Sequence, residues 1–387
     1  MCYADLTKKI DELYDEYVSI WEDICNIESP TNYKKGVDEV GLYIIKLVEK
    51  FGWKVEIFTQ EVSGNVVCIT MNENAKKQPI AISGHIDTVH SVGSFGTPAV
   101  KIKNGKIYGP GVMDCKGGVV AGLMAMHALN ECGFNSRPVM LLLQTDEENS
   151  SITSNKETIR YICEKAKNCL AFLNMECNEE YFNGKACVER KGILKYKFTI
   201  IGKETHASYC AKEGANAITE AAYKIIEIEK IKDDEGVTCN VGVIKGGSVV
   251  NTVAGECSFE VDVRFSNQEQ MEWIQKQLKE IADKQFVQGC TTALTLMSFR
   301  TAMELSNKNI ELLNKMNIIF RENGLSELVI GKRRGGSDAA DVSSFGIPCV
   351  DSLGVKGEHA HSIQEEADLD SLSESAKRIA LVISNIK

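Results

Sequence analysis

The sequence lacks a long apolar segment. No run approaches the roughly 18 apolar residues that a membrane-spanning helix needs, and the longest candidate, 119–129, contains a histidine. Residues 1–21 carry charges throughout and lack the apolar stretch of a secretory signal. We therefore expect a protein that has no membrane partner and works in the cytoplasm.

An excess of basic residues is also missing. The chain has 44 Lys and Arg against 54 Asp and Glu, which gives a net charge of −10. General nucleic-acid binders usually carry a basic face. We therefore expect no nucleic-acid partner.

Several short motifs are absent. The 14 cysteines include no C-x-x-C pair, which excludes a zinc ribbon or a thioredoxin-type site, and we expect most of them to be reduced thiols in the core. The phosphate-binding motif G-x-x-x-x-G-K-[ST] and the motif G-x-G-x-x-G do not occur. Neither does G-x-S-x-G, which disfavours a serine nucleophile.

What is present is typical of a globular protein of more than one domain. The chain has 387 residues, of which 43% are apolar and 25% charged. Apolar spacing predicts helices over 4–28, 36–51, 119–129, 306–323 and 369–386, and buried strands over 55–58, 66–70, 80–83, 139–144 and 170–175. This alternation predicts an α/β domain with a mostly parallel mixed sheet that helices cover on both faces.

The middle of the chain has a different order. Residues 194–201, 237–244, 257–265 and 291–298 are expected to form strands, and 215–231 and 269–286 helices. This β-α-β-β-α-β order is typical of a separate α+β domain. We expect residues 190–301 to form an inserted domain, and residues 1–189 and 302–387 to form the larger α/β domain.

The motif SGHIDT follows a short apolar strand. His85 and Asp87 would lie at the carboxyl end of that strand, where open α/β sheets bind ligands. In extended backbone the two side chains share a face, so the carboxylate can orient an imidazole that binds a metal. A solvated turn with a hydrogen-bonded histidine is an equally good interpretation.

The segment GPGVMDCKGG precedes the helix expected over 119–129. Glycine permits backbone shapes that other residues avoid, and Asp114 on such a loop can direct its two oxygens at two cations. A phosphate-binding loop is the alternative because the segment precedes a helix. The missing lysine motif favours the carboxylate ligand.

Acidic residues follow two further strands. Three successive acids in TDEE follow a buried strand, and such crowding is unfavourable unless a cation or hydrogen bonds offset it. Glu147 and Glu148 point in different directions, so one can bind a metal while the other serves as a base. A solvated acidic turn is the alternative. Glu176 follows the strand 170–175.

Histidines complete the pattern. Of the six in the chain, His85 follows the strand expected over 80–83, and His359 and His361 follow a further strand expected over 349–352. Imidazole mixed with carboxylates suits zinc, cobalt or manganese rather than thiolate-held zinc. A carboxylate shared by two ions is typical of a two-metal site.

Taken together, these motifs resemble those of the zinc-dependent peptidase and deacylase family that includes glutamate carboxypeptidase, acetylornithine deacetylase, succinyl-diaminopimelate desuccinylase, aminoacylase and peptidase T. The resemblance covers nearly the whole chain in order: GHIDT, GPGVMDCKGG, TDEE, NMEC, ETHAS with GANA, GGSDAAD and a late AHS. The Gly-Pro-Gly before Asp114 and the glutamate at position 176 favour the carboxypeptidase branch.

The resemblance implies a metal site with two zinc ions, for which cobalt or manganese are alternatives. His85 and Glu176 would hold one ion, Glu148 and His361 the other, and Asp114 would bridge them.

The resemblance also implies roles for residues next to the metal ligands. Asp87 would orient His85, and Glu147 would be the general base and acid. The peptide bond between Asp114 and Cys115 would be cis. A thiol at position 115, where relatives commonly have Met or Asp, could compete for metal.

The late motif contains two histidines. His361 is favoured because its distance to Glu365 and Glu366 resembles the family pattern, and His359 is the alternative.

The inserted domain would be a lid that also dimerises. His206 resembles a residue that reaches a neighbouring subunit's active site and stabilises the oxyanion. Asn251 and Arg300 match positions that bind a substrate carboxylate, and Gly336 resembles a glycine that supplies backbone contacts. A solvated surface position is the alternative for Arg300.

We therefore expect a homodimeric, dinuclear metal-dependent hydrolase that cleaves the amide bond of a small peptide or a C-terminal amino-acid conjugate. The alternative is an N-acyl-amino-acid deacylase, whose substrate would be an acylated amino acid. A non-catalytic metal- or peptide-binding relative is disfavoured because Glu147 and every proposed ligand are present.

Overall fold

The chain folds into two compact units. The computed structural model describes residues 3–179, 183–209, 212–231 and 236–387. The larger unit comprises Met1–Val188, Leu305–Lys332 and Ser337–Lys387, and the smaller unit comprises Glu189–Glu304 and Arg333–Gly336. The segment Arg333–Gly336 thus belongs with the smaller unit, although it lies outside the insertion expected over 190–301.

A mixed six-stranded sheet forms the centre of the larger unit, as predicted. β3 lies parallel to both β6 and β7, and β7 lies parallel to β15, whereas β2 is antiparallel to β1 and β6. β2, β3 and β6 are buried along their whole length, which explains their continuous apolar sequences. The strand order is β1 (Lys54–Phe58), β2 (Val66–Met71), β6 (Val139–Gln144), β3 (Ile80–His85), β7 (Ala171–Asn174) and β15 (Cys349–Val350).

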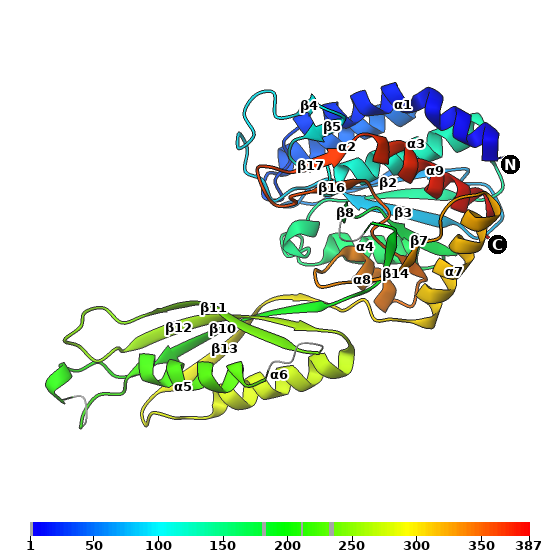
Figure 1. The fold of residues 1–387 in the computed structure, drawn as a ribbon. Helices are drawn as coiled ribbons and strands as arrows, with labels where there is room; N and C mark the ends of the chain where they lie inside the picture. The colour runs from blue at the N-terminus through cyan, green and yellow to red at the C-terminus, as the bar shows by residue number, and fades with distance from the viewer. Residues whose placement is uncertain (1–2, 180–182, 210–211, 232–235) are drawn as a thin grey trace. The chain divides into compact units, whose positions relative to one another are not determined.

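Helices cover both faces of this sheet (Figure 1). On one face lie α1 (Tyr3–Asn26), α3 (Lys116–Glu131) and α9 (Asp370–Asn385), and on the other lie α4 (Glu157–Ala166) and α8 (Asp338–Ser344). α2 (Lys34–Glu49) contacts β2, and α7 (Asn307–Glu322) contacts β15 and α9. None of the helices in the described residues is long and apolar enough to cross a membrane.

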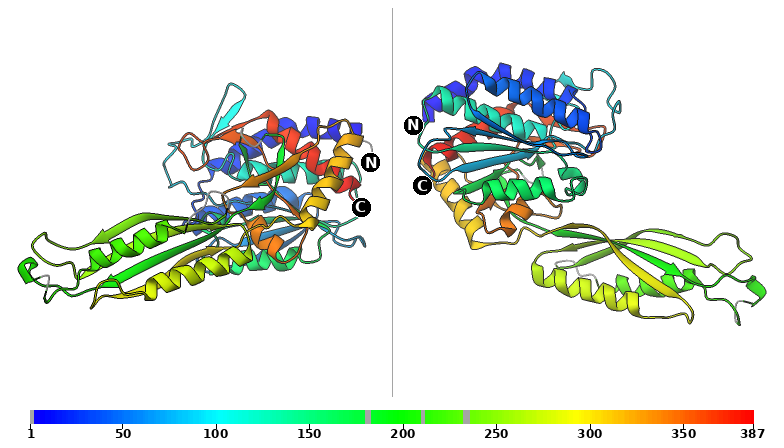
Figure 2. Two further views of the ribbon diagram at one scale, coloured as in Figure 1. Left: turned by 60° about the horizontal axis from the view of Figure 1, so that its bottom comes forward. Right: turned by 180° about the vertical axis from the view of Figure 1, so that it is seen from behind.

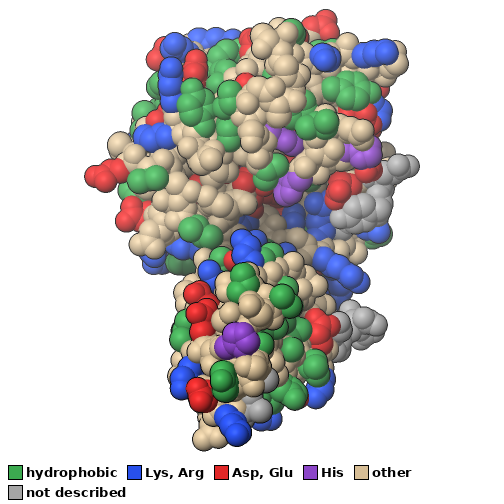
Figure 3. All heavy atoms as spheres, turned by 90° about the vertical axis from the view of Figure 1, so that its left-hand side faces the viewer, with side chains coloured by type: hydrophobic (Ala, Val, Ile, Leu, Met, Phe, Trp, Pro, Cys, Tyr) green, Lys and Arg blue, Asp and Glu red, His purple; other side chains and the backbone are tan. Residues whose placement is uncertain are grey.

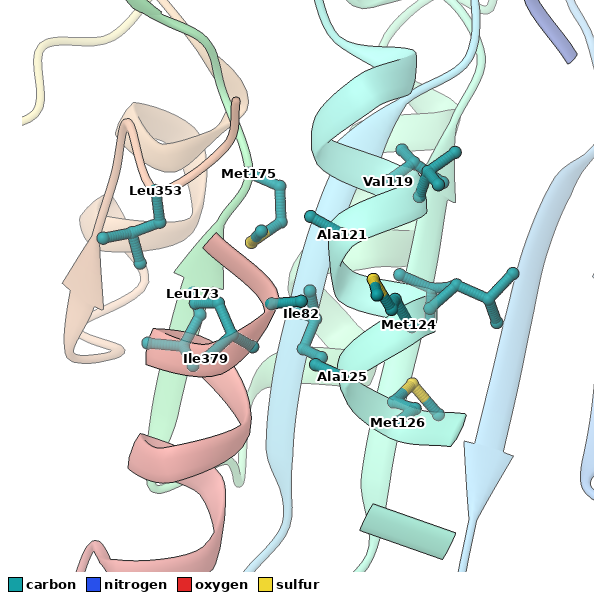
Figure 4. Close-up of a cluster of buried hydrophobic side chains, with 14 of the residues drawn as sticks. Ile82, Val119, Ala121, Met124, Ala125, Met126, Leu173, Met175, Leu353 and Ile379 are labelled. Carbon is teal, nitrogen blue, oxygen red and sulfur yellow. The ribbon is translucent and has the colours of Figure 1, made fainter. Parts of the chain in front are cut away.

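The packing of α3 positions the loop that precedes it. Residues from Lys116 to Leu129 of this helix are buried, and its apolar side chains pack with those of β3, β7 and α9 (Figure 4). Gly118 permits this close fit, because a Cβ atom there would lie 1.9 Å from the carbonyl oxygen of Met175. The first turn of α3 therefore lies directly against the segment after β7, which carries Glu176.

Several short elements were not predicted from the sequence. A five-stranded sheet has the order β4 (Lys101–Lys103), β5 (Lys106–Tyr108), β17 (Glu366–Asp368), β16 (Lys356–Glu358) and β8 (Asn178–Glu179). Strands of two or three residues are too short to show a period-two pattern. β9 (Lys185–Arg190) pairs with β14 (Val329–Arg333) in a separate ribbon.

The smaller unit has the predicted β-α-β-β-α-β order. Its antiparallel sheet is arranged β11 (Thr238–Gly246), β12 (Glu256–Phe265), β10 (Gly192–Ile201) and β13 (Thr291–Arg300). α5 (Ala217–Glu229) and α6 (Gln268–Asp283) pack on one face of the sheet (Figure 2). Alternate residues of β10 and β12, including Phe198 and Phe259, point into the core between sheet and helices.

Candidate metal centre

His85 is the last residue of β3 and is only 2% exposed. Its Nδ1 atom lies 2.9 Å from the carbonyl oxygen of Asp87 and 3.4 Å from the Asp87 Oδ1 atom. Its Nε2 atom lies 3.1 Å from Asp114 Oδ1 and 3.7 Å from Glu176 Oε1. Because Nδ1 donates to the Asp87 carbonyl, Nε2 is the nitrogen that can bind a cation.

Asp114 lies between two histidines. It is carried by the loop between β5 and α3, and its peptide bond to Cys115 is cis, which confirms the expectation from the sequence. While Oδ1 faces His85, Oδ2 lies 3.3 Å from the Nε2 atom of His361. The two oxygens of one carboxylate are thus directed at two different imidazoles.

His361 lies on the loop between β16 and β17. Its Nε2 atom is 3.2 Å from Glu148 Oε2, and its side chain is 58% exposed. Figure 3 shows histidine side chains close to acidic ones on the surface of the larger unit. The φ angle of His361 is +62°, a left-handed conformation that is uncommon for residues other than glycine and is typical of functional sites. The structure therefore brings His361, rather than the alternative His359, to Asp114 and Glu148.

Asp87 connects the strand that carries His85 to the acidic turn after β6. The turn is the 3-10 helix η1 (Glu147–Asn149). The Asp87 carboxylate accepts hydrogen bonds from the amides of Glu147 (3.2 Å) and Glu148 (3.3 Å) and from the Thr31 hydroxyl (2.7 Å). The sequence predicted only that Asp87 orients His85; in the structure the same carboxylate also fixes the two glutamates.

The electrostatics of this cluster favour cations. Burial and the neighbouring Asp114 raise the pKa of Glu148 to about 8, although a hydrogen bond from His361 opposes this. Hydrogen bonds to Asp114 and Glu148 raise the pKa of His361 to about 11. Burial would raise the pKa of Asp114, but hydrogen bonds from His361 and His85 bring it below its usual range. Protonated imidazoles thus supply the positive charge that these crowded carboxylates require, and a metal ion can take that place.

The donor atoms fit a divalent metal. Single ligand atoms of His85, Asp114 and Glu148 lie within 4.8 Å of one another, and so do those of Asp114, Glu176 and Cys177. Imidazole nitrogen combined with carboxylate oxygen is a donor set for zinc, cobalt or manganese. The site therefore has the ligands that such an ion needs.

Cys115 is the thiol that could compete for metal. Its Sγ atom lies 3.1 Å from the carbonyl oxygen of Met175, to which it donates a hydrogen bond. Burial raises the pKa of the Cys115 thiol well above its ordinary value. The Sγ atom also lies within 4.8 Å of ligand atoms of His85 and Glu176. Because the thiolate is the form that binds metals, the hydrogen bond and the raised pKa favour Asp114 over Cys115 as the ligand.

The residues predicted to contact substrate lie in the smaller unit. His206 is exposed, and its Nδ1 atom accepts a hydrogen bond from the Ser208 amide at 3.2 Å. It lies beside Asn251, whose carbonyl oxygen accepts the amide of Ala207. The structure thus places His206 and Asn251 on two adjacent loops.

Arg300 and Gly336 form a second pair. Arg300 ends β13 and is only 2% exposed, so the alternative of a solvated surface arginine is wrong. A Cβ atom on Gly336 would lie 2.7 Å from the Arg300 Cδ atom, and the close contact of these residues depends on glycine.

Glu365 and His90 have no role predicted from the sequence. Glu365 is 1% exposed and accepts hydrogen bonds from the backbone of the Asp114 loop and from His90. These partners are between 251 and 275 residues away along the chain, so local spacing carries no signal for them. Glu365 and Glu366 form an acidic pair after the late histidine motif, and this pair is the sequence feature that could have indicated the role of Glu365.

Comparison with known proteins gives matches over most of the chain. Residues 188–290 match the model of the peptidase dimerisation domain, and residues 65–225 match that of peptidase family M28. Carboxypeptidase G2 from Pseudomonas sp. (strain RS-16) is 26% identical over 350 residues, which are 89% of this chain and 83% of that protein. Succinyl-diaminopimelate desuccinylase from Rickettsia felis is 25% identical over 374 residues, which are 92% of this chain and 96% of that protein.

A solved structure shows the same fold. The tripeptidase from Staphylococcus aureus superimposes with a TM-score of 0.77 at 23% identity and covers 96% of this chain and 98% of that one. The fold and the matched models define a metallopeptidase-type hydrolase. The chain is similar to metallopeptidases and amidohydrolases of the M20 family, which hydrolyse peptides or acylated amino acids, and this similarity confirms the resemblance found in the sequence motifs.

Proposed function

We propose that this protein is a dinuclear metal-dependent exopeptidase that hydrolyses the amide bond of a small peptide or a C-terminal amino-acid conjugate. One observation carries the proposal. The two carboxylate oxygens of Asp114 face His85 and His361 at 3.1 and 3.3 Å, and each histidine has a second carboxylate, Glu176 or Glu148, within 4 Å. This is the donor arrangement expected for two ions that share one ligand.

The metal ligands divide into two sets around Asp114. His85 and Glu176 would hold one ion, and His361 and Glu148 the other, with zinc as the proposed metal and cobalt or manganese as alternatives. Bound divalent ions would polarise the scissile carbonyl and acidify water at the site. Asp87 keeps the Nε2 atom of His85 directed at its ion, because the Nδ1 atom donates to the Asp87 carbonyl at 2.9 Å.

Glu147 is the proposed general base and acid. It lies next to Glu148 in η1, it is 9% exposed, and its amide is held by Asp87. Its carboxylate would accept the proton of the attacking water and then deliver that proton to the leaving nitrogen. Direct transfer requires the carboxylate to be within about 3 Å of that water.

The smaller unit would contact the substrate. Because the Nδ1 atom of His206 accepts the Ser208 amide, the ring proton resides on Nε2, which can donate to the developing oxyanion from a neighbouring subunit. Arg300 and Asn251 would bind the substrate carboxylate, with Gly336 supplying backbone contacts. The planar guanidinium of Arg300 has the paired donors that match the geometry of a carboxylate.

A homodimer would form through α5 and β11 of the smaller unit. β11 is an edge strand of its sheet, and an unpaired edge is a template for another strand. Ile218, Ile226 and Tyr223 of α5 and Ile244 of β11 are 41–54% exposed, so apolar surface lies next to that edge. The match to the peptidase dimerisation domain supports this interface.

We place the enzyme in the cytoplasm. The cysteines in the described residues form no disulfide bond, and most of them are buried. Disulfides are rare in reducing compartments, so their absence from the described residues fits such a compartment. Blocking of these thiols by alkylation only after unfolding would support the assignment, whereas disulfides in protein from native cells would contradict it.

The test is an assay of the purified chain after removal of metal and reloading with zinc, cobalt or manganese. The substrates are dipeptides, tripeptides and N-acylated amino acids, compared by kcat/KM. Preference for peptides or C-terminal conjugates supports the proposal. Absence of metal-dependent amide hydrolysis across the panel contradicts it.

A second candidate is an N-acyl-amino-acid deacylase with the same residues in the same roles. The observation that favours it is the match to a desuccinylase, which extends over 96% of that protein. Highest kcat/KM with acetylated or succinylated amino acids would establish this alternative.

A further inference from the structure

Glu365 lies at the centre of a hydrogen-bond cluster next to the candidate metal centre. Its Oε1 atom accepts the amides of Met113 (2.9 Å) and Asp114 (3.0 Å). Its Oε2 atom accepts the amide of Gly111 (3.1 Å) and the Nε2–H group of His90 (2.7 Å). A carboxylate can accept about four hydrogen bonds, so these four donors nearly fill its capacity. Because the side chain is only 1% exposed, water cannot replace the carboxylate as the acceptor for these donors.

This cluster connects the two loops that carry Asp114 and His361. Glu365 directly precedes β17, which pairs with β5, and its own carbonyl oxygen accepts the Gly109 amide at 3.3 Å. His361 lies four residues before Glu365 on the same loop. One side chain therefore fixes the loop of Asp114 against the loop of His361.

The other ligands have independent support. His85 ends β3, and Glu176 follows β7, and both strands lie inside the central sheet. Their positions are set by strand pairing and by the packing of α3. Asp114 and His361 lie instead on irregular backbone, and the buried Glu365 carboxylate accepts three amide hydrogen bonds from the Asp114 loop.

We propose that Glu365, supported by His90, is a positioning residue that maintains the distance between Asp114 and His361 and thereby sets the affinity of the ion that these two side chains share. The inference rests on the proposed dinuclear function. Loss of this carboxylate should weaken the ion held by His361 and Glu148 more than the ion held by His85 and Glu176. Residues that orient metal ligands typically change metal affinity by about 10–100-fold, and we expect an effect of this size.

The experiment is zinc titration of the full-length chain by chelator competition, with stoichiometry measured after dialysis. The variant E365Q keeps the shape of the side chain but directs an NH₂ group at backbone amides that need an acceptor. We expect wild type to bind two ions, and E365Q to bind the first normally and the second about 10–100-fold more weakly. The absorption spectrum of the cobalt-loaded protein should change in parallel.

A matched control separates positioning from loss of stability. Glu220 in the smaller unit is also 1% exposed and also accepts two backbone amides, those of Phe286 (2.9 Å) and Val287 (2.6 Å). E220Q should lower the midpoint of denaturation but keep both zinc affinities. If E365Q keeps both affinities, or loses both ions equally, the inference is wrong.

If E365Q does not fold, variants of His90 test the positioning role of Glu365. H90A removes one donor and should weaken the second ion, and H90Q, which can restore an N–H donor to Glu365, should recover most of that loss. Wild-type zinc affinity in H90A would overturn the inference. A wild-type chain that binds fewer than two ions would instead contradict the proposed function, so the two failures are distinguishable.

Discussion

The substitution D87N tests how one buried carboxylate organises the metal centre. Asp87 accepts hydrogen bonds from Thr31 (2.7 Å), Glu147 (3.2 Å) and Glu148 (3.3 Å), and its Oδ1 atom is 3.4 Å from His85 Nδ1. An asparagine whose oxygen keeps the Thr31 contact places its NH₂ group at the Oδ1 position, opposite the Glu147 amide and His85. One buried N–H group then loses its acceptor, at a cost of about 1–3 kcal/mol.

The expected loss of metal affinity in D87N corresponds to a free energy of similar size. Loss of a residue that orients metal ligands typically weakens binding about 10–100-fold, which corresponds to about 1.4–2.8 kcal/mol. We therefore expect zinc affinity and kcat to fall together in D87N, measured by chelator competition and steady-state kinetics. T31V removes one donor to the same carboxylate but leaves its charge, and it should have a smaller effect. Wild-type zinc affinity and turnover in D87N would refute this reasoning.

Three further substitutions, one of them with a matched control, test other parts of the structure. E147Q should keep two bound ions but lower kcat by about 10²–10⁴-fold, and full turnover or loss of metal would contradict its role as the base. G118A places a Cβ atom 1.9 Å from the backbone oxygen of Met175 and should lower the free energy of unfolding in urea by about 1–3 kcal/mol or more. G122A in the same helix meets only side chains, of which Ile82 is the nearest at 2.9 Å, and should cost less; equal losses would show that backbone contact is not the cause. I226E should convert the proposed homodimer into a monomer in sedimentation experiments, and an unchanged dimer would exclude this face of α5 as the interface.

The principal elements could be predicted because their apolar patterns are long. The helix expected over 119–129 extends over Lys116–Glu131, and the strand expected over 139–144 is Val139–Gln144. Polar motifs directly after such strands indicated where ligands would gather, since the carboxyl ends of parallel strands meet at one edge of a sheet. His85 and Glu176, which follow β3 and β7, are the residues for which this reasoning is most direct.

The remainder depends on contacts that sequence spacing does not encode. Glu365 and Gly111 are 254 residues apart, and the strands that bring them together have only three residues each. Asp87 also fixes Glu147 and Glu148 by accepting their backbone amides in the η1 turn. Every residue type except proline has such an amide, so the sequence does not indicate this contact. The small sheet that supports the His361 loop is therefore visible only in three dimensions.

The central claim is that the side chains around Asp114 hold two metal ions. The most direct measurement is anomalous diffraction at the zinc absorption edge from crystals of the zinc-loaded chain. We expect two peaks about 3.5–4 Å apart, one beside His85 and Glu176 and the other beside His361 and Glu148. A single peak, or peaks outside this cluster, would contradict it.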